Sequence, residues 1–192
     1  MKLSDLQLPS VSQQKRRTRV EIRDQKTRQT VAVESDDPLT GYHLDVDDAD
    51  WEEGEPHPDG VIVGIVDDTV WVCFIELKGT LAAKEGKEDP SDKAFRQLEG
   101  GVSRFHPHPD SVGEAHHRAW RVGTDRLDLL PAKDHRVVGV AVAYRHVPRP
   151  APHKPLRIGR TLVPLKVVAL HGNVANLATI EFRQLLVSAG LL

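Results

Sequence analysis

The feature that most constrains this fold is the stretch 59–79, which reads DGVIVGIVDDTVWVCFIELKG. It contains two apolar runs, 61–66 and 69–75, separated only by Asp67 and Asp68. Short runs rich in Val and Ile that flank a two-residue acidic turn predict a β-hairpin. Because neither run alternates polar with apolar residues, both strands are expected to be covered on both faces, as in the middle of a sheet.

The register of this hairpin follows from counting. If Asp67 and Asp68 form the turn, Asp59 lies opposite Glu76 at the open end. Directly opposed Cβ atoms of an antiparallel pair are about 4.5–5.5 Å apart, and carboxylates held that close repel unless a cation or a shared proton lies between them. Lys78 is two positions beyond Glu76 and therefore lies on the same face. This grouping predicts a divalent-metal site, since Mg²⁺ is commonly bound by one or two carboxylates with water and phosphate.

These residues, followed by a predicted helix that carries Gln97, resemble the PD-(D/E)xK nuclease superfamily, which has the restriction-endonuclease-like fold. The resemblance implies that Asp59 and Glu76 hold Mg²⁺, for which Mn²⁺ would substitute, and that the Leu77 carbonyl completes the ligand set. It also implies that Lys78 orients or deprotonates the attacking water and that Gln97 supports the site. The implied activity is hydrolysis of phosphodiester bonds, with DNA favoured over RNA as the substrate.

One acidic position of that superfamily has no clear counterpart here. Many members place a glutamate on a helix before the hairpin, and this sequence predicts no helix there. Glu21, Glu34, Asp45 and Asp47 are the available candidates. If none serves, the alternative is a catalytically inactive nuclease-like domain that binds nucleic acid or assembles a larger complex. A further alternative is a structural protein in which the acids and the lysine of the hairpin end form a salt bridge without metal.

Apolar patterns elsewhere predict a single α/β domain with a central mixed sheet and helices on its faces. The pattern over 19–34 indicates a polar hairpin or two edge strands, and 136–144 and 162–170 each read as a strand, the first beside the central hairpin. Apolar residues at helical spacing predict a helix over 90–105 that packs on the sheet, and another over 179–191.

The predicted helix after the hairpin has two local features. Pro90 opens it, with Ser91 or Asp92 expected as the N-cap. Gly100 and Gly101 in its interior either weaken the helix or allow another backbone to approach closely.

Charge is strongly segregated along the chain, although the net charge is only −2. Residues 1–33 carry eight basic and three acidic groups, for +5; residues 34–59 carry eleven acidic groups and no Lys or Arg, for −11; residues 131–192 carry nine basic and two acidic groups, for +7. This division predicts a basic N-terminal arm or hairpin over 1–33 and one nuclease-like domain over 34–192, with its core at 59–105.

A second basic region follows the strand predicted over 136–144. Between positions 145 and 160 the chain contains five Lys or Arg residues and no acid. A segment of this charge beside a phosphodiester site predicts contact with the nucleic-acid backbone. An extended basic surface loop without a partner is the alternative. The residues concerned are Arg145, Arg149, Lys154, Arg157 and Arg160.

A histidine group raises the question of a second metal. His106, His108, His116 and His117 have spacings that can bind a transition metal, but no cysteine lies nearby. A proline-rich surface loop is the preferred interpretation, and a zinc site is the alternative.

The remaining composition bears on location and partners. Cys73 is the single cysteine and lies within an apolar strand, so no disulfide is expected and a reducing cytoplasm is the predicted compartment. No apolar run has the length of a membrane span. With no separate recognition module, target choice is expected to come from a homodimer or a partner protein, and phage defence is a role that would fit.

Overall fold

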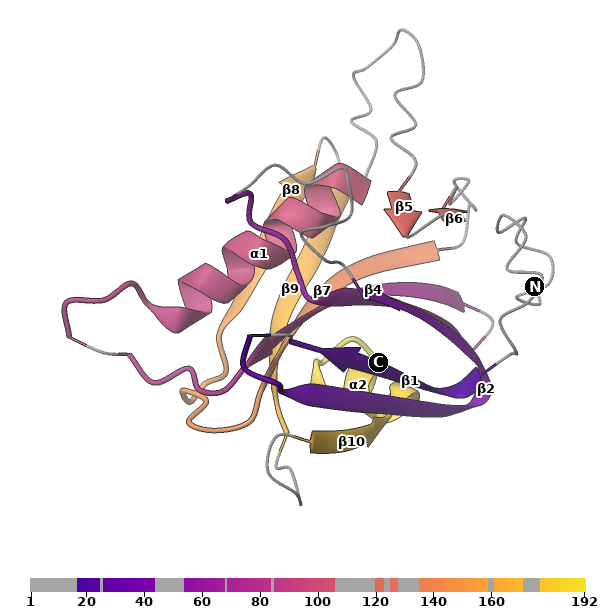
Figure 1. Cartoon of the computed structure of the whole chain (residues 1–192), viewed down its shortest axis with the longest axis horizontal. Helices are drawn as coiled ribbons and strands as arrows, with labels where there is room; N and C mark the ends of the chain where they lie inside the picture. Colours follow the sequence, from indigo (N-terminus) through magenta and orange to yellow (C-terminus); the bar gives the residue numbers. More distant parts are fainter. Residues whose placement is uncertain are drawn as a thin grey trace, which may run out of the picture.

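The computed structural model describes residues 17–24, 26–43, 54–67, 69–83, 85–105, 120–122, 125–127, 135–158, 161–170 and 177–192. These residues form a strand-rich α/β fold in which one eight-stranded mixed sheet is accompanied by a separate two-stranded sheet (Figure 1). Its strands are β1 (Arg17–Arg23), β2 (Thr30–His43), β3 (Gly60–Val66), β4 (Thr69–Lys78), β5 (Trp120–Val122), β6 (Asp125–Leu127), β7 (His135–Ala143), β8 (His153–Ile158), β9 (Thr161–Ala169) and β10 (Leu177–Glu181); its helices are α1 (Pro90–Phe105) and α2 (Phe182–Ser188).

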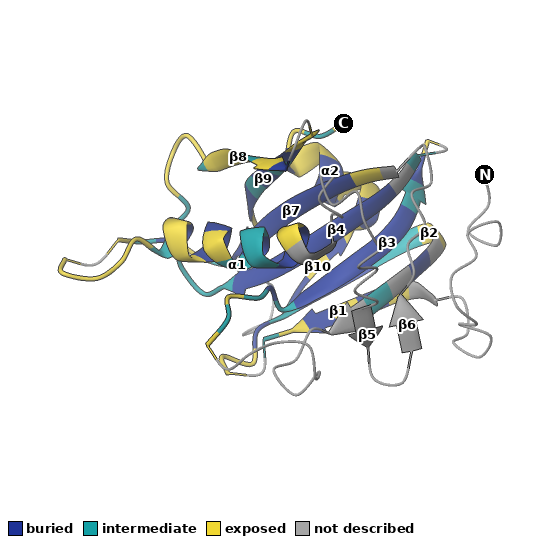
Figure 2. Cartoon of the chain, turned by 90° about the horizontal axis from the view of Figure 1, so that it is seen from above, coloured by how far each residue is buried: buried dark blue, intermediate teal, exposed yellow. Residues whose placement is uncertain are grey.

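The main sheet has the order β1-β2-β3-β4-β7-β9-β8, and β10 pairs with β2. Helix α1 packs on one face, over β4 and β7, and α2 packs on the other, against β2 and β10 (Figures 1 and 2). Two hydrophobic cores result, one on each side of the sheet. The expectation of an α/β fold with a mixed sheet is therefore confirmed.

The central hairpin has the predicted register. Antiparallel pairs run from Val66↔Thr69 at the turn to Gly60↔Ile75 at the open end. Residues 71–77 of β4 are all buried, and so is most of β3, as expected for strands covered on both faces. The next strand in the sheet, β7, is parallel to β4, so the connection that contains α1, β5 and β6 joins two neighbouring parallel strands.

Helix α1 begins at Pro90, with Asp89 as its cap. The Asp89 Oδ1 atom accepts a hydrogen bond of 2.7 Å from the backbone N–H of Ser91. The prediction of Ser91 or Asp92 as the N-cap was therefore wrong by two or three positions. The reason is that proline suits the first helical position, where its missing N–H costs nothing, so the cap lies before it.

The glycine pair of α1 allows the segment before β3 to pack against the helix. A Cβ atom on Gly100 would overlap the Pro56 carbonyl oxygen, and one on Gly101 would lie 2.7 Å from the Pro58 Cγ atom. Of the two alternatives for Gly100 and Gly101, close approach of another backbone is the one observed. This contact fixes the path of the chain immediately before Asp59.

Strand β2 is longer and more central than predicted. It continues to His43, beyond the range 19–34 that indicated a polar hairpin or two edge strands, and it pairs with β1, β10 and β3 rather than lying at an edge. The boundary expected between residues 33 and 34 falls inside this strand. The N-terminal hairpin and the central hairpin are thus parts of the same sheet.

Two further elements differ from prediction near the C-terminus. Residues 179–181 belong to β10, so the last helix is only Phe182–Ser188; Ile180 is buried because β10 pairs in parallel with β2. The basic segment 145–160, for which an extended surface loop was one alternative, contains the edge strand β8. Neither described helix has the length and apolarity needed to cross a membrane.

Candidate active site

The site predicted at the open end of the hairpin is assembled at the C-terminal end of β4. Glu76 and Lys78 project on the α1 side of the sheet, whereas the Leu77 side chain lies in the core on the opposite face. Glu76 is only 2% exposed, which is unusual for a carboxylate. The alternation of the strand therefore places one buried acid and one amine together, as the spacing predicted.

Asp59 is held at the same end by the backbone of β4. Its Oδ2 atom accepts a hydrogen bond of 2.7 Å from the N–H of Leu77. The neighbouring Lys78 carbonyl faces the other way, because it accepts 3.1 Å from the N–H of Tyr144 after β7. The N–H and C=O of one residue leave a strand on the same side, so the Leu77 carbonyl projects towards Asp59, as its N–H does. This is the side on which the carbonyl was expected to act as a metal ligand.

Lys78 and Gln97 connect the strand to the helix. The Lys78 Nζ atom donates to the Glu76 Oε1 atom and, at 2.6 Å, to the Gln97 Oε1 atom. The Gln97 Nε2 atom in turn donates to the His57 carbonyl at 3.2 Å. The amide of Gln97 thus joins β4, α1 and the segment before Asp59, and the structure brings together Asp59, Glu76, Lys78 and Gln97, the four predicted site residues.

Burial raises the pKa of both acids. The pKa of Asp59 rises to about 6, with desolvation as the main cause and the hydrogen bond from Leu77 opposing it. The pKa of Glu76 rises to about 8, first through desolvation and then through the nearby charge of Asp59, against the opposing effect of Lys78. One ammonium group therefore does not compensate two carboxylates in this environment.

One atom of this group has no partner. The Glu76 Oε2 atom is buried and no described residue donates a hydrogen bond to it. A buried polar atom without a partner is costly, typically by about 1–3 kcal/mol. The donor set beside it consists of oxygens from Asp59 and Glu76, with the Leu77 carbonyl on the same side, and such oxygens are the ligands that Mg²⁺ prefers. These residues fit a divalent cation.

Few side chains are available to bind a metal ion at this site. Among the described residues, no three His, Cys, Asp or Glu side chains converge closely enough to hold a metal ion between them. Asp59 and Glu76 are neighbouring acids, and two carboxylates are within the usual complement for Mg²⁺, whose other positions are filled by water and substrate phosphate.

The turn between β1 and β2 contributes residues that the sequence did not single out. Asp24 lies close enough to raise the pKa of both Asp59 and Glu76. Its carboxylate is engaged within its own turn, where it accepts hydrogen bonds from the backbone N–H of Lys26, at 2.8 Å, and from the Thr27 hydroxyl. Asp24 is therefore a neighbouring charge whose oxygens already have partners.

Gln29 and Tyr144 also reach this end of β4. The Gln29 side chain is buried against Gly79, where a Cβ would lie 2.6 Å from its Nε2 atom. The Tyr144 hydroxyl donates to the Thr30 carbonyl at 2.6 Å, and burial, together with the charge of Asp59, raises its pKa. The sequence indicated only a polar hairpin over 19–34. The proximity of its turn to β4 depends on the packing of strands that are far apart in the chain.

The candidates for a further acidic position are placed as follows. Glu21 and Glu34 both form ion pairs with Arg19, at 2.9 and 2.7 Å. Neither is among the charged groups that shift the pKa of Asp59 or Glu76. Asp45 and Asp47 lie outside the described residues, as do His106, His108, His116 and His117.

The described basic residues between β7 and β9 are exposed, but they lie at different places on the sheet. Arg145 follows Tyr144 directly and so lies beside the end of β4. Lys154 forms an ion pair with Glu99 of α1. Arg157 lies towards the opposite end of the sheet, since β8 runs antiparallel to β9 while β9 is parallel to β7. Arg149 is also exposed, and Arg160 is outside the described residues.

Comparisons of the chain with protein-family models, with curated proteins and with solved structures give no match.

Proposed function

We propose that this protein hydrolyses phosphodiester bonds of nucleic acid, with DNA as the favoured substrate, at a divalent-metal site formed by Asp59 and Glu76. The observation that supports the proposal is the buried, unpartnered Glu76 Oε2 atom beside a second raised-pKa acid. A restriction-endonuclease-like core belongs to the same proposal. The arrangement that favours it is the hairpin followed by α1 and a strand parallel to β4.

The metal, when bound, would polarise the scissile phosphate and lower the pKa of a coordinated water. Asp59 and Glu76 would hold it, with the Leu77 carbonyl as a third ligand. Lys78 has three N–H donors, and its hydrogen bonds to Glu76 and Gln97 use two of them. The third would hydrogen-bond to the attacking water or to a phosphate oxygen. Gln97 keeps the ammonium in place by accepting one of these bonds.

Exposed cations near the site suit a polyanionic substrate. Arg145 lies beside the end of β4, and Arg149 follows in the same connection to β8. In the proposed complex these two residues contact the phosphate backbone, which positions a strand without reading its sequence. Lys154 contributes less because Glu99 already pairs with it, and Arg157 lies at the far end of β8.

A salt bridge without metal is the competing explanation, and one observation favours it. Lys78 does pair with Glu76, as a structural ion pair would. However, such a pair gives no reason to bury a second acid beside it or to leave Glu76 Oε2 without a donor. A catalytically inactive domain that still binds nucleic acid would retain the exposed arginines but not the metal dependence.

The test is a plasmid-nicking assay with Mg²⁺ or Mn²⁺ on the wild type and matched variants. Asp59→Asn and Lys78→Met are expected to lower the cleavage rate at least ~100-fold, the usual scale for removing a group that stabilises a developing charge. The controls are Asp67→Asn, at the turn end of the same hairpin, and Lys93→Met, on the exposed side of α1. Both controls should cleave at the wild-type rate.

Three results would contradict the proposal. Cleavage that survives Asp59→Asn or Lys78→Met would remove these residues from the mechanism. Cleavage that persists in EDTA would remove the metal. Absence of cleavage of plasmid, linear single strands and RNA by the folded wild type, with retained DNA binding in a gel-shift assay, would favour the inactive binding domain.

A further inference from the structure

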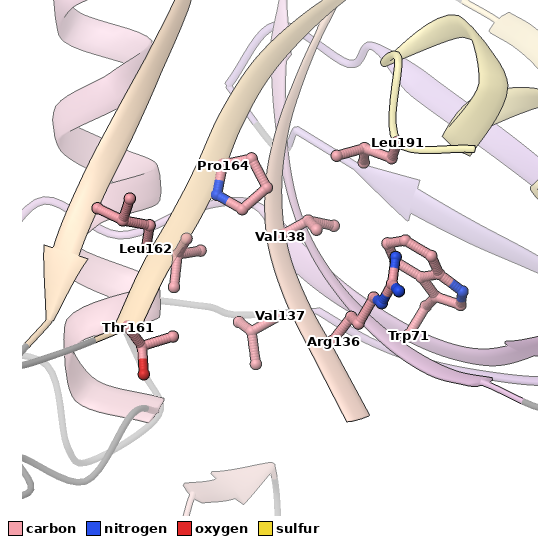
Figure 3. A pocket seen from close by; sticks show the side chains of 9 residues that line it. Trp71, Arg136, Val137, Val138, Thr161, Leu162, Pro164 and Leu191 are labelled. Atoms are coloured by element: carbon pink, nitrogen blue, oxygen red, sulfur yellow. The ribbon is translucent and has the colours of Figure 1, made fainter. Parts of the chain in front are cut away.

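A cavity of about 310 Å³ opens between the first residues of β7 and those of β9, at the opposite end of β4 from Glu76 (Figure 3). Its walls come from both hydrophobic cores: Trp71 and Val138 belong to one, and Val137 and Val163 belong to the other. Because residues from both faces line it, the cavity is a split between two strands of the sheet and not a groove on one face.

Proline chemistry explains why the sheet splits here. Strands β7 and β9 pair only from Gly139↔Leu165 onwards, although β9 continues to pair with β8 over its first residues. In that second ladder Pro164 lies opposite Pro155. Two residues without an N–H can face each other only at a non-hydrogen-bonded pair, so the Pro164 nitrogen is turned towards β7 and has no proton to donate. The ladder therefore stops, and the strands diverge.

The wall of the split carries one cation. Arg136 is exposed, and its guanidinium lies 5.3 Å from the centroid of the Trp71 ring, a cation–π distance that holds the group in one place. Arg136 is the charged member of the described lining, and among the described residues no carboxylate forms an ion pair with it.

The rest of the lining is almost entirely apolar. Leu162 is 62% exposed at the mouth, an unusual position for a large aliphatic side chain. Thr161 supplies a hydroxyl near the same edge. Figure 3 shows the side chains of Leu162 and Pro164 on the side of the cavity away from Arg136, and that of Leu191 above Trp71. An apolar chamber with one fixed guanidinium at its edge is complementary to a molecule with an apolar body and one negative charge.

We propose that this split binds a compact organic anion, an aryl-alkyl or medium-chain carboxylate, whose carboxylate pairs with Arg136. Its apolar body lies between β7 and β9, against Leu162 and Pro164. The volume is at the small end of the range of about 300–1,000 Å³ usual for ligand pockets, which selects a small ligand. Because the split lies at the other end of β4, this site is independent of the proposed hydrolytic activity.

The test is a calorimetric titration of the full chain with 4-phenylbutyrate and with its neutral match, 4-phenylbutan-1-ol. The carboxylate is expected to bind saturably with one site per chain, at least ~10-fold more tightly than the alcohol, as one charge-assisted contact requires. Arg136→Gln should remove that preference and leave the affinity for the alcohol unchanged. Arg23→Gln, an exposed cation on β1 at the opposite edge of the sheet, is the matched control and should bind both molecules as the wild type does.

A second variant tests the location. Leu162→Trp places a larger side chain at the mouth and should weaken binding of both molecules, with the folded state checked by circular dichroism. Absence of saturable carboxylate binding up to ~10 mM would overturn the proposal, and so would equal binding by the wild type and Arg136→Gln or by the wild type and Leu162→Trp. A concentration-dependent dimer in sedimentation that Leu162→Trp abolishes would assign the split to a second copy of the chain and would also overturn it.

Discussion

At the scale of single residues, the main feature is that two acids are buried with one amine. Asp59 and Glu76 have raised pKa values because desolvation outweighs the help they receive from Lys78 and from the Leu77 amide. The folded protein therefore disfavours the ionised form of both acids. Such a cost persists in natural proteins mainly where a site needs it, and here a bound cation would offset it.

The first prediction concerns the pH dependence of stability without metal. The pKa of Glu76 rises from its ordinary 4.5 to about 8, and that of Asp59 from 3.8 to about 6. An acid whose pKa is higher in the folded state binds more protons there, so the free energy of unfolding falls as pH rises between the two values. In EDTA, wild-type stability should fall from pH 5 to pH 8, and Glu76→Gln should reduce the slope by up to about 1.4 kcal/mol per pH unit.

Urea unfolding at several pH values measures this slope. Glu85→Gln is the control, because Glu85 is exposed in the loop before α1 and its loss should leave the slope unchanged. Equal slopes for the wild type and Glu76→Gln would mean that Glu76 ionises as easily in the folded chain as in the unfolded one.

The sequence predicts some of these residues and not others, for a physical reason. Asp59, Glu76 and Lys78 follow from the turn and the two-residue period of a strand, both of which are local rules, and Gln97 follows from the resemblance. Asp24, by contrast, reaches the site through the pairing of β1 with β2 and the packing of that hairpin near β4. No local period encodes such a contact, so Asp24 was visible only as part of a polar turn.

At the scale of elements, local patterns predicted the hairpin and α1 well because each is stabilised by its own turn, cap or apolar stripe. They failed where pairing decides the structure. Strand β2 continues past Asp36 and Asp37, which lie in a register shift of its ladder with β1, because β1 and β3 pair with the residues on either side. Residues 179–181 were predicted as the start of the helix over 179–191, yet they pair with β2 as part of β10. Tertiary pairing overrides weak local preference in both cases.

The second prediction tests the contact between α1 and the segment before β3. Gly100→Ala would drive a Cβ into the Pro56 carbonyl, which is backbone and cannot move aside cheaply. We expect a loss of about 1–3 kcal/mol in the free energy of unfolding, the usual cost of overpacking. Because the same segment provides the His57 carbonyl that orients Gln97, the cleavage rate should also fall.

Ser103→Ala is the control for this helix, since Ser103 is exposed on α1 and alanine there slightly favours the helix. Both quantities can be measured on the same preparations, by urea unfolding and by plasmid nicking. A Gly100→Ala protein with wild-type stability would show that residues 54–58 do not pack on the helix as described.

At the scale of the whole molecule, the two proposed sites lie at opposite ends of the sheet. The acids lie where β4 ends, and the split between β7 and β9 lies where β4 begins, near Trp71. Both sites occur where the regular ladder stops: one beyond the end of β3, the other at Pro164. Positions of this kind expose backbone groups and admit side chains that a continuous sheet would exclude.

The last prediction uses global stability to detect the metal. A ligand that binds only the folded chain stabilises it by RT ln(1 + [L]/Kd), or about 2.7 kcal/mol at a hundredfold excess over Kd. For a chain of 192 residues this corresponds to a rise in Tm of roughly 5–10 °C on adding Mg²⁺ or Mn²⁺. Protons compete for the same carboxylates, whose pKa values are about 6 and about 8, so the rise should be larger at pH 8 than at pH 5.5.

Variants separate this effect from unspecific binding of cations. Asp59→Asn should abolish the rise, whereas Asp67→Asn, at the exposed turn of the same hairpin, should retain it. A rise that is equal at both pH values, or equal in the two variants, would place the cation elsewhere on the surface. If Mg²⁺ and Mn²⁺ do not raise the Tm of the wild type at pH 8, no cation offsets the cost of burying the unpartnered Glu76 oxygen. Glu76 would then belong to a structural ion pair with Lys78.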